Sequence, residues 1–240
     1  MDIFFIIIEN IGVIAFSVAG AMIAIDKEAD IAGVLILALT TAFGGGIMRD
    51  ILLGYIPPRF FTEYYIEIAI SLTSAIVVFI FASAYKKTFL EKERLIGSIN
   101  NFFDAAGLGI FSVYSANMAV EMGYTEPIVV ISMGVIASVG GGLVRDLILR
   151  DIPFIIKKHV YFVAALLGAS VYYVLSVLLS LNPVVASFAG FFVTFVLRIL
   201  ATVFKWNLPR AITFSKIDRI DNTKAQEKRK RGEDVSQKNI

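Results

Sequence analysis

The chain of 240 residues has no cysteine and only one histidine, His159. The missing thiols exclude structural disulfides, cysteine nucleophiles and thiolate metal sites, and a single histidine cannot build a histidine metal cluster. The sequence also lacks the HExxH and GxSxG motifs of zinc proteases and serine hydrolases. We therefore expect the chain not to be an enzyme, and to need no cofactor and no resident metal ion.

Charged residues are scarce as well, at 18% of the chain against 58% hydrophobic residues. Soluble chains are about 45–50% apolar, and the excess here falls in blocks of roughly 20 residues, the length that crosses a bilayer. The sequence predicts an all-α membrane protein with seven transmembrane helices. We expect them at about 3–25, 31–53, 63–85, 102–121, 127–149, 160–181 and 183–204.

Lysine and arginine are unevenly distributed between the two sides of these spans. Arg59 is the only loop cation on the side that holds the N-terminus, whereas the other side holds Lys27, the basic 86–101 loop and the C-terminal segment. The positive-inside rule then places the N-terminus outside and the C-terminus in the cytoplasm, most simply in the cell membrane. The transmembrane domain, 1–204, is followed by a tail, 205–240, with ten Lys/Arg and five Asp/Glu. We expect this basic cytoplasmic tail to be partly disordered and to touch anionic lipid rather than nucleic acid.

The chain contains an internal repeat. Residues 44–57 read GGGIMRDILLGYIP, residues 140–153 read GGGLVRDLILRDIP, and eight of these fourteen positions are identical. Each copy holds three spans, about 3–85 and about 102–181, so the second copy enters the membrane from the opposite face. The sequence predicts two inverted three-helix repeats and a seventh helix at about 183–204. A duplication that only built a stable bundle is the alternative.

Each repeat carries a glycine triplet. The six residues are Gly44, Gly45, Gly46, Gly140, Gly141 and Gly142. Glycine costs about 0.8–1.0 kcal/mol in a helix relative to alanine, and a close-packing face would space glycines four residues apart. We therefore expect both helices to break or kink beside a polar pathway, where freed carbonyls can bind a cation. A kink needed only for packing is the alternative.

Three hydroxyl residues lie just before the triplets: Thr40, Thr41 and Ser138. They are candidate pore ligands, although such residues as often bond to their own helix backbone or pack.

Six charged residues fall inside or near the ends of the expected spans. They are Glu9, Arg49, Asp50, Asp104, Arg145 and Asp146. Charges in hydrocarbon are costly and rarely face lipid, so we expect them to line or gate a pore; interfacial, snorkelling positions are the alternative. We predict one layer that pairs Glu9 with Arg49 and a second that pairs Asp104 with Arg145. Neighbouring residues on a helix do not face each other, so Arg49 should not pair with Asp50.

The doubled GGGxxRD motif, the inverted repeats and the seventh helix resemble the prokaryotic branch of the trimeric intracellular cation (TRIC) channel family. That branch overlaps a glycine-transporter-like family. The resemblance covers about residues 3–204. It implies a homotrimer with a pore through each subunit, gated at the kinked second and fifth helices. The pore would conduct monovalent cations, chiefly K⁺, with Na⁺ less clearly excluded.

A secondary transporter of glycine or another small zwitterion is the competing function, because inverted repeats with broken helices also build transporters. A channel predicts a continuous wet path. A transporter predicts saturable uptake and a closed central pocket.

Overall fold

The computed structural model describes residues 3–85, 93–157 and 160–206. The chain divides into one unit that spans Met1–Asn207 and a second that spans Leu208–Ile240. The predicted basic tail therefore lies, except for its first two residues, outside the described residues.

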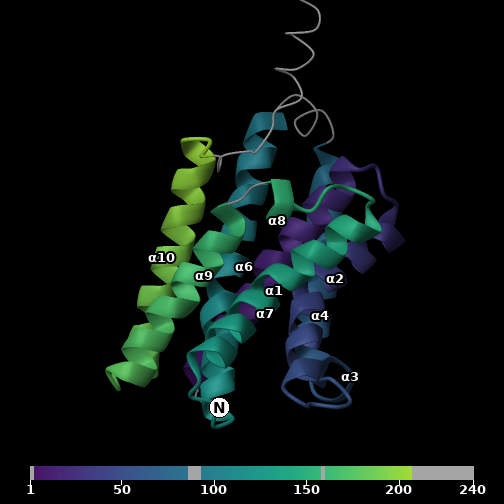
Figure 1. The fold of residues 1–240 in the computed structure, drawn as a ribbon. Coiled ribbons are helices and arrows are strands. Elements are labelled where there is room, and N and C mark those ends of the chain that lie inside the picture. Colours follow the sequence, from purple (N-terminus) through teal and green to yellow (C-terminus); the bar gives the residue numbers. More distant parts are fainter. Residues whose placement is uncertain (1–2, 86–92, 158–159, 207–240) are drawn as a thin grey trace, which may run out of the picture. The chain divides into compact units, whose positions relative to one another are not determined.

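All regular elements of the described residues are helices. Figure 1 shows them in order: α1 (Ile3–Asp26), α2 (Ile31–Leu52), α3 (Arg59–Thr62), α4 (Tyr65–Ala84), α6 (Glu93–Glu121), α7 (Pro127–Ile148), α8 (Phe154–Lys157), α9 (Val160–Tyr173), the π-helical η1 (Val174–Leu178) and α10 (Pro183–Val203).

Six candidate membrane spans are long and apolar enough to cross a bilayer. They are α1, α2, α4, α7, α9 continued by η1, and α10. Their bounds lie close to six of the ranges expected from the sequence. The chain is an all-helical integral membrane protein.

The remaining long helix, α6, differs from the sequence expectation. It begins at Glu93 rather than at residue 102, so part of the segment expected as a loop is helical. With 29 residues it is about 43 Å long at 1.5 Å per residue, which exceeds the ~30 Å hydrocarbon core. A helix does not have to stop where its apolar stretch ends, because water satisfies the backbone beyond it.

The helix ends follow from local sequence. The Asp30 side chain accepts a hydrogen bond of 2.8 Å from the backbone N–H of Gly33 and caps α2. Asn182 caps α10 in the same way, and the first residues of α7 and α10 are prolines, which suit a helix start. These capped starts fix where each helix enters the bundle.

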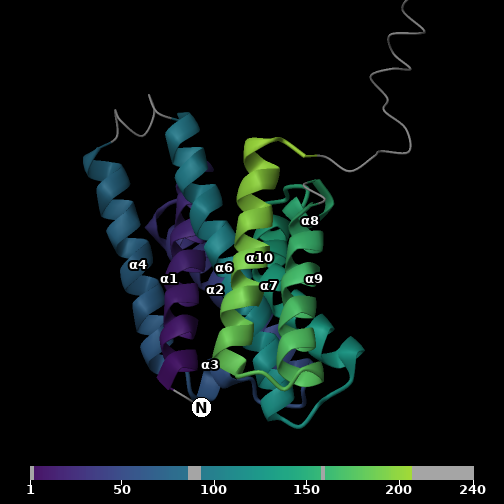
Figure 2. The same ribbon diagram turned by 90° about the vertical axis from the view of Figure 1, so that its left-hand side faces the viewer.

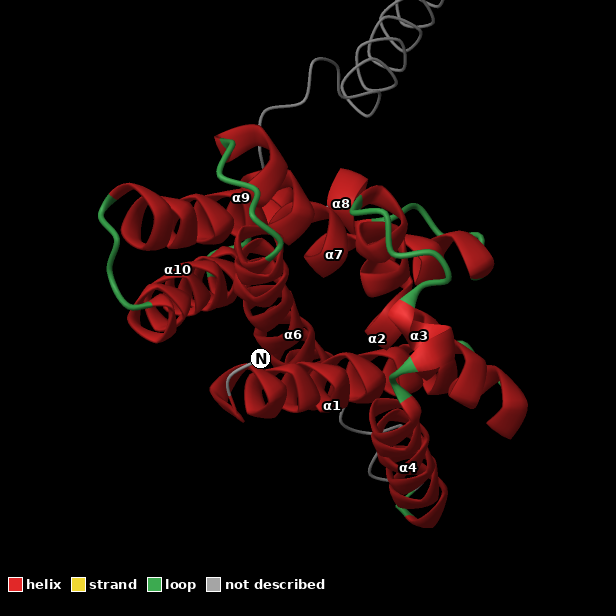
Figure 3. Cartoon of the chain, turned by 90° about the horizontal axis from the view of Figure 1, so that it is seen from below, coloured by secondary structure: helices red, strands yellow, loops and turns green. Residues whose placement is uncertain are grey.

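The bundle has α2 and α7 packed against each other, with α1 against α2 and α6, and α10 against α6 and α9. Figure 2 shows α1, α6 and α10 side by side, and Figure 3 shows the same arrangement along the bundle. The rings of Phe16 and Phe111 stack at 5.3 Å between α1 and α6. Ser17 donates a hydrogen bond of 2.7 Å to Ser71, which ties α1 to α4. These contacts hold the helices that surround the α2–α7 pair.

Candidate functional site

The glycine triplets lie where α2 meets α7. A Cβ atom at position 45 would overlap the backbone carbonyl of Ala137, and a Cβ atom at position 141 would overlap that of Thr41. A Cβ atom on Gly140 would lie 2.9 Å from the Cα atom of Gly45. The glycines therefore let the two backbones touch, and a larger residue would force the helices apart.

Both helices continue without interruption through the triplets. The expectation that the triplets break the hydrogen-bond ladder is therefore wrong for this structure. The close backbone contact explains two glycines of each triplet. The third faces an arginine instead: a Cβ atom on Gly46 would lie 3.6 Å from Nη2 of Arg49, and one on Gly142 would lie 3.6 Å from Nη2 of Arg145.

The hydroxyl groups before the triplets bond to their own helices. Thr41 donates a hydrogen bond of 2.6 Å to the carbonyl of Leu37, and Ser138 donates one of 3.0 Å to the carbonyl of Val135. Both side chains are buried, whereas Thr40 is only partly so. In this conformation Thr41 and Ser138 serve the helix backbone.

A first charged cluster, the Arg49 cluster, consists of Glu9, Arg49, Asp50, Arg59 and Tyr64. The Nε and Nη2 atoms of Arg49 donate hydrogen bonds of 3.0 and 2.8 Å to Oδ1 of Asp50. Its Nη1 atom donates one of 3.0 Å to Ser115 on α6. Nη2 of Arg59 lies 3.4 Å from the same Asp50 oxygen. Two arginines thus share one carboxylate.

Glu9 completes the Arg49 cluster from α1 and is 5% exposed. The hydroxyl groups of Tyr64 and Tyr114 lie beside its carboxyl group. The ion pairs of the described part of the chain link Arg49 to Asp50, not to the predicted partner Glu9.

A second cluster, the Arg145 cluster, consists of Asp104, Arg145, Asp146, Tyr161 and Arg198. Nε of Arg145 donates a hydrogen bond of 2.9 Å to Asp146, and Nη1 lies 3.8 Å from Oδ1 of Asp104. Nη2 of Arg198 donates one of 3.2 Å to Oδ2 of Asp104. The Tyr161 hydroxyl donates one of 3.3 Å to Oδ1. The predicted meeting of Asp104 with Arg145 is present, with Arg198 as an additional partner.

Each Arg–Asp dipeptide forms a direct pair, so the expectation that Arg49 would not pair with Asp50 is wrong. The rule of helix faces concerns where Cβ atoms point, and an arginine side chain is long enough to fold back onto its neighbour. The other oxygen of Asp50 accepts a 3.0 Å hydrogen bond from the backbone N–H of Arg59, at the start of α3. Asp146 accepts one of 2.8 Å from Phe154, at the start of α8. The dipeptide therefore also positions the segment that follows its helix.

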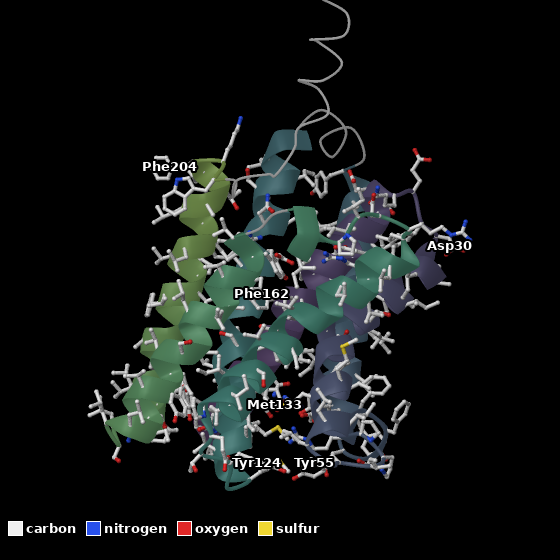
Figure 4. All side chains as sticks on the ribbon, viewed as in Figure 1. Asp30, Tyr55, Tyr124, Met133, Phe162 and Phe204 are labelled. Atoms are coloured by element: carbon white, nitrogen blue, oxygen red, sulfur yellow. The ribbon has the colours of Figure 1, made fainter. Side chains whose placement is uncertain are left out.

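The two clusters lie near opposite ends of the bundle, because α2 ends beside α3 and α7 ends beside α8 (Figure 1). Figure 4 shows Tyr55 and Tyr124 together at the end that holds α3, with Phe204 at the other end. Such aromatic residues are typical of the membrane–water interface. Each cluster therefore lies toward one of the two ends of the bundle.

Each of the four arginines of the two clusters lies near an aromatic ring, which belongs to a tyrosine for three of them and to a phenylalanine for the fourth. The Arg49 guanidinium lies 5.6 Å from the ring centre of Tyr114, and that of Arg59 lies 5.4 Å from Tyr64. Arg198 lies 4.5 Å from Tyr161, and Arg145 lies 5.4 Å from Phe154. Desolvated cation–π contacts of this kind contribute roughly 2 kcal/mol. The rings thus compensate for part of the cost of burying the charges.

Two arginines of the clusters were missed by sequence reasoning. Arg59 was taken as a loop cation, yet it is buried and also contacts the Met118 sulfur. Arg198 was not singled out, although it is the only charged residue in the sequence of α10. An isolated arginine in an apolar span is a signal that could have found it.

Sequence comparison places the chain in a family. A family profile described as "Glycine transporter" matches residues 6–83 and 101–177, more than half of the chain. The chain is 35% identical over 206 residues to the UPF0126 membrane protein YvgT of Bacillus subtilis, an alignment that covers 85% of this chain and 94% of YvgT. It is 30% identical to the UPF0126 inner membrane protein YadS of Escherichia coli over 84% of this chain and 92% of YadS.

Solved structures agree with this result. A TRIC trimeric intracellular cation channel orthologue from Rhodobacter sphaeroides has a TM-score of 0.76 and 32% identity, with coverage of 85% of this chain and all of that chain. A structure that explains conductance through TRIC cation channels has a TM-score of 0.74 and 34% identity, with coverage of 86% and 97%.

The helical bundle with two buried arginine–carboxylate clusters in its interior defines an integral membrane protein. The chain belongs to the TRIC family, which overlaps the glycine transporter family of UPF0126 membrane proteins. The resemblance stated from the doubled GGGxxRD motif is confirmed.

Proposed function

We propose that the protein is a monovalent cation channel, chiefly for K⁺ and less strictly against Na⁺, with a pore through each subunit of a homotrimer. The observation that carries the proposal is the glycine-lined contact between the backbones of α2 and α7, with one buried charged cluster toward each membrane face. The chain also shares 32–34% identity with TRIC cation channels. The pathway would follow α2 and α7 and the charged residues of α1 and α6.

The proposed topology has seven spans in two inverted repeats plus α10, with the N-terminus outside and the C-terminus in the cytoplasm. Three observations support it. The family profile matches two separate segments of similar length, 6–83 and 101–177. Each Arg–Asp dipeptide ends one helix and holds the start of a short helix after it. The length of α6, 29 residues, is sufficient for a seventh span.

The proposed gate lies at the α2–α7 contact. Glycine has no side chain that could interlock with the facing helix, so separating α2 from α7 loses few dispersion contacts. While the two backbones touch, they leave no room for an ion between them. Opening would separate Gly45 from Ala137 and Gly141 from Thr41. The exposed carbonyls could then replace part of a cation's hydration shell.

The charges would act at the two ends of the pathway. Each cluster balances two arginines with two carboxylates, and buried charges of this kind need such partners. The roles of Glu9, Arg49 and Asp50 at one end and of Asp104, Arg145 and Asp146 at the other are therefore to hold the helix ends. They would also set the electrostatic field that a passing cation meets.

Single-channel recording of the purified protein in lipid bilayers under a KCl gradient tests the proposal. We expect discrete openings with a reversal potential near that of K⁺. Silent bilayers, together with saturable glycine uptake into liposomes from the same preparation, would refute the channel. Those results would instead support a transporter, in which an arginine and a carboxylate of one cluster bind the two ends of a zwitterion.

A further inference from the structure

The two clusters follow one pattern but differ in the source of their second arginine. Arg59 begins α3, directly after the first Arg–Asp helix, and therefore belongs to the first repeat. Arg198 lies on α10, which is outside both repeats. The Arg145 cluster thus depends on a helix that has no counterpart in the Arg49 cluster.

The second arginines also bind different carboxylates. Arg59 approaches Asp50, which is already bound by Arg49, at 3.4 Å. Arg198 instead binds Asp104 of α6 at 3.2 Å, while Arg145 remains 3.8 Å from the same carboxylate. The shorter distance shows that Asp104 is bound by α10 more closely than by α7.

The remaining contacts of Asp104 also show that it is bound mainly by residues other than Arg145. Its Oδ1 atom accepts the Tyr161 hydroxyl and its Oδ2 atom accepts Arg198, and the Arg198 guanidinium lies on the Tyr161 ring. Nη2 of Arg145 lies 2.9 Å from Oδ1 of Asp146, whereas Nη1 makes no hydrogen bond with the described residues, although the side chain is 0% exposed. A buried guanidinium nitrogen without a hydrogen-bond partner is unusual. Arg198 therefore binds Oδ2 of Asp104, while Oδ1, the oxygen that faces Arg145, is bound by the Tyr161 hydroxyl.

We infer that Arg198 is a positioning residue of the proposed channel: it holds the Asp104 carboxylate through Oδ2 and cancels its charge, so that α10 sets how strongly this end of the pathway attracts cations. The inference rests on the proposed channel function. Arg198 acts through Asp104 and does not itself need to touch a cation.

Charge balance makes the inference testable. The wild-type cluster has two arginines and two aspartates and is neutral. Arg198→Gln leaves one net negative charge, Asp104→Asn leaves one net positive charge, and the double variant is neutral again. A single charge at a narrow mouth changes the local cation concentration, here by about two- to fivefold at low salt.

The experiment is patch-clamp recording of full-length protein in spheroplast membranes, where its orientation is uniform. In Arg198→Gln, the current of cations that enter from the Arg145 end should become about two- to fivefold larger than the current in the opposite direction. A salt concentration of 1 M should weaken this rectification. Arg198→Lys should keep the wild-type rectification, and Asp104→Asn should rectify in the opposite direction. The double variant should return to wild type.

The Arg49 cluster supplies the matched control. Arg59→Gln removes one positive charge at the other end, so its rectification should have the opposite sign to that of Arg198→Gln. A variant that merely loosened the fold would lower all currents without this sign dependence. If Arg198→Gln does not reach the membrane, the rectification of Asp104→Asn is compared with that of the double variant instead. The double variant is neutral, so the rectification seen in Asp104→Asn must be absent from it.

The outcomes separate the two proposals. A wild-type protein without cation current would refute the channel and this inference with it. If the wild-type protein conducts but Arg198→Gln leaves its rectification unchanged, the role of Arg198 is refuted and the channel function is not. The same conclusion follows if Arg59→Gln shifts the rectification in the same direction as Arg198→Gln.

Discussion

Replacing Gly45 by alanine should destabilise the protein, whereas the same change at the adjacent Gly46 should stabilise it. A Cβ atom at position 45 would overlap the carbonyl of Ala137, which is backbone and cannot rotate away. At position 46 the nearest atom is Nη2 of Arg49 at 3.6 Å, an ordinary contact. Both positions lie in the middle of the continuous helix α2, so their helix propensities are equivalent.

The magnitudes follow from two opposing terms. Alanine gains about 0.8–1.0 kcal/mol over glycine inside a helix at either position. Overpacking costs about 1–3 kcal/mol, and rigid backbone places Gly45→Ala at the upper end. The net change is then a loss of about 2 kcal/mol at position 45 and a gain of about 1 kcal/mol at position 46. At 2–4 °C per kcal/mol, the two variants should differ in Tm by roughly 6–12 °C.

Thermal unfolding in detergent, followed by fluorescence-detected size exclusion, measures this difference. The repeat provides a second pair, because a Cβ atom on Gly141 would overlap the carbonyl of Thr41 and one on Gly142 would lie 3.5 Å from the Tyr161 hydroxyl. Equal Tm values for Gly45→Ala and Gly46→Ala would refute the reasoning, since they would show that α2 and α7 do not touch at this level.

Three further variants test the contacts around this pair of helices. Asp146→Asn removes the carboxylate that pairs with Arg145 at 2.9 Å and leaves a buried charge uncompensated; we expect a loss of about 3–5 kcal/mol, and an unchanged Tm would argue against the pair. Ser17→Ala removes the bond to Ser71 and should cost only about 0.6 kcal/mol, the average for such bonds in membranes; a loss several times larger would point to another role. Lys27, in the loop before α2, pairs with Asp151 at 2.6 Å, and this partner raises its pKa above the ordinary 10.5. The contribution of this ion pair to stability is therefore present below pH 10.5 and lost as the pH rises through the raised pKa. The Tm difference between wild type and Lys27→Met should therefore disappear at high pH and also in high salt.

The spans were predictable because they depend on local properties. Apolar blocks of bilayer length, ended by capping residues and prolines, specify the bounds of six of the spans to within three residues. The start of α6 was not predictable in this way. Asn100, Asn101 and Asp104 lower the hydropathy of its first half, yet a buried Asp104 with three partners belongs inside the bundle. Hydropathy measures affinity for lipid, and it cannot register a polar residue that is satisfied by protein.

The glycine triplets show a different limit. Spacing rules identify a packing face from residues four apart on one helix, and on that basis the triplets indicated a break. The contact is instead formed by neighbouring glycines on both helices, with Gly45 against Gly140 and Gly44 against Gly141. Whether a glycine serves a kink or a contact is decided by the partner helix, and the sequence of one helix does not contain that information.

Sequence reasoning found six of the charged residues and the meeting of Asp104 with Arg145, but it missed Arg59 and Arg198. The reason has a consequence for the proposed channel. Repeat symmetry relates Glu9 to Asp104 and Arg49 to Arg145, so it predicts equal layers. Arg198 removes that equality, because α10 occurs once in the chain and binds only one of the two layers. A channel with two identical ends would pass cations equally in both directions. In this chain, rectification would therefore be determined by α10, the helix that lies outside both proposed repeats.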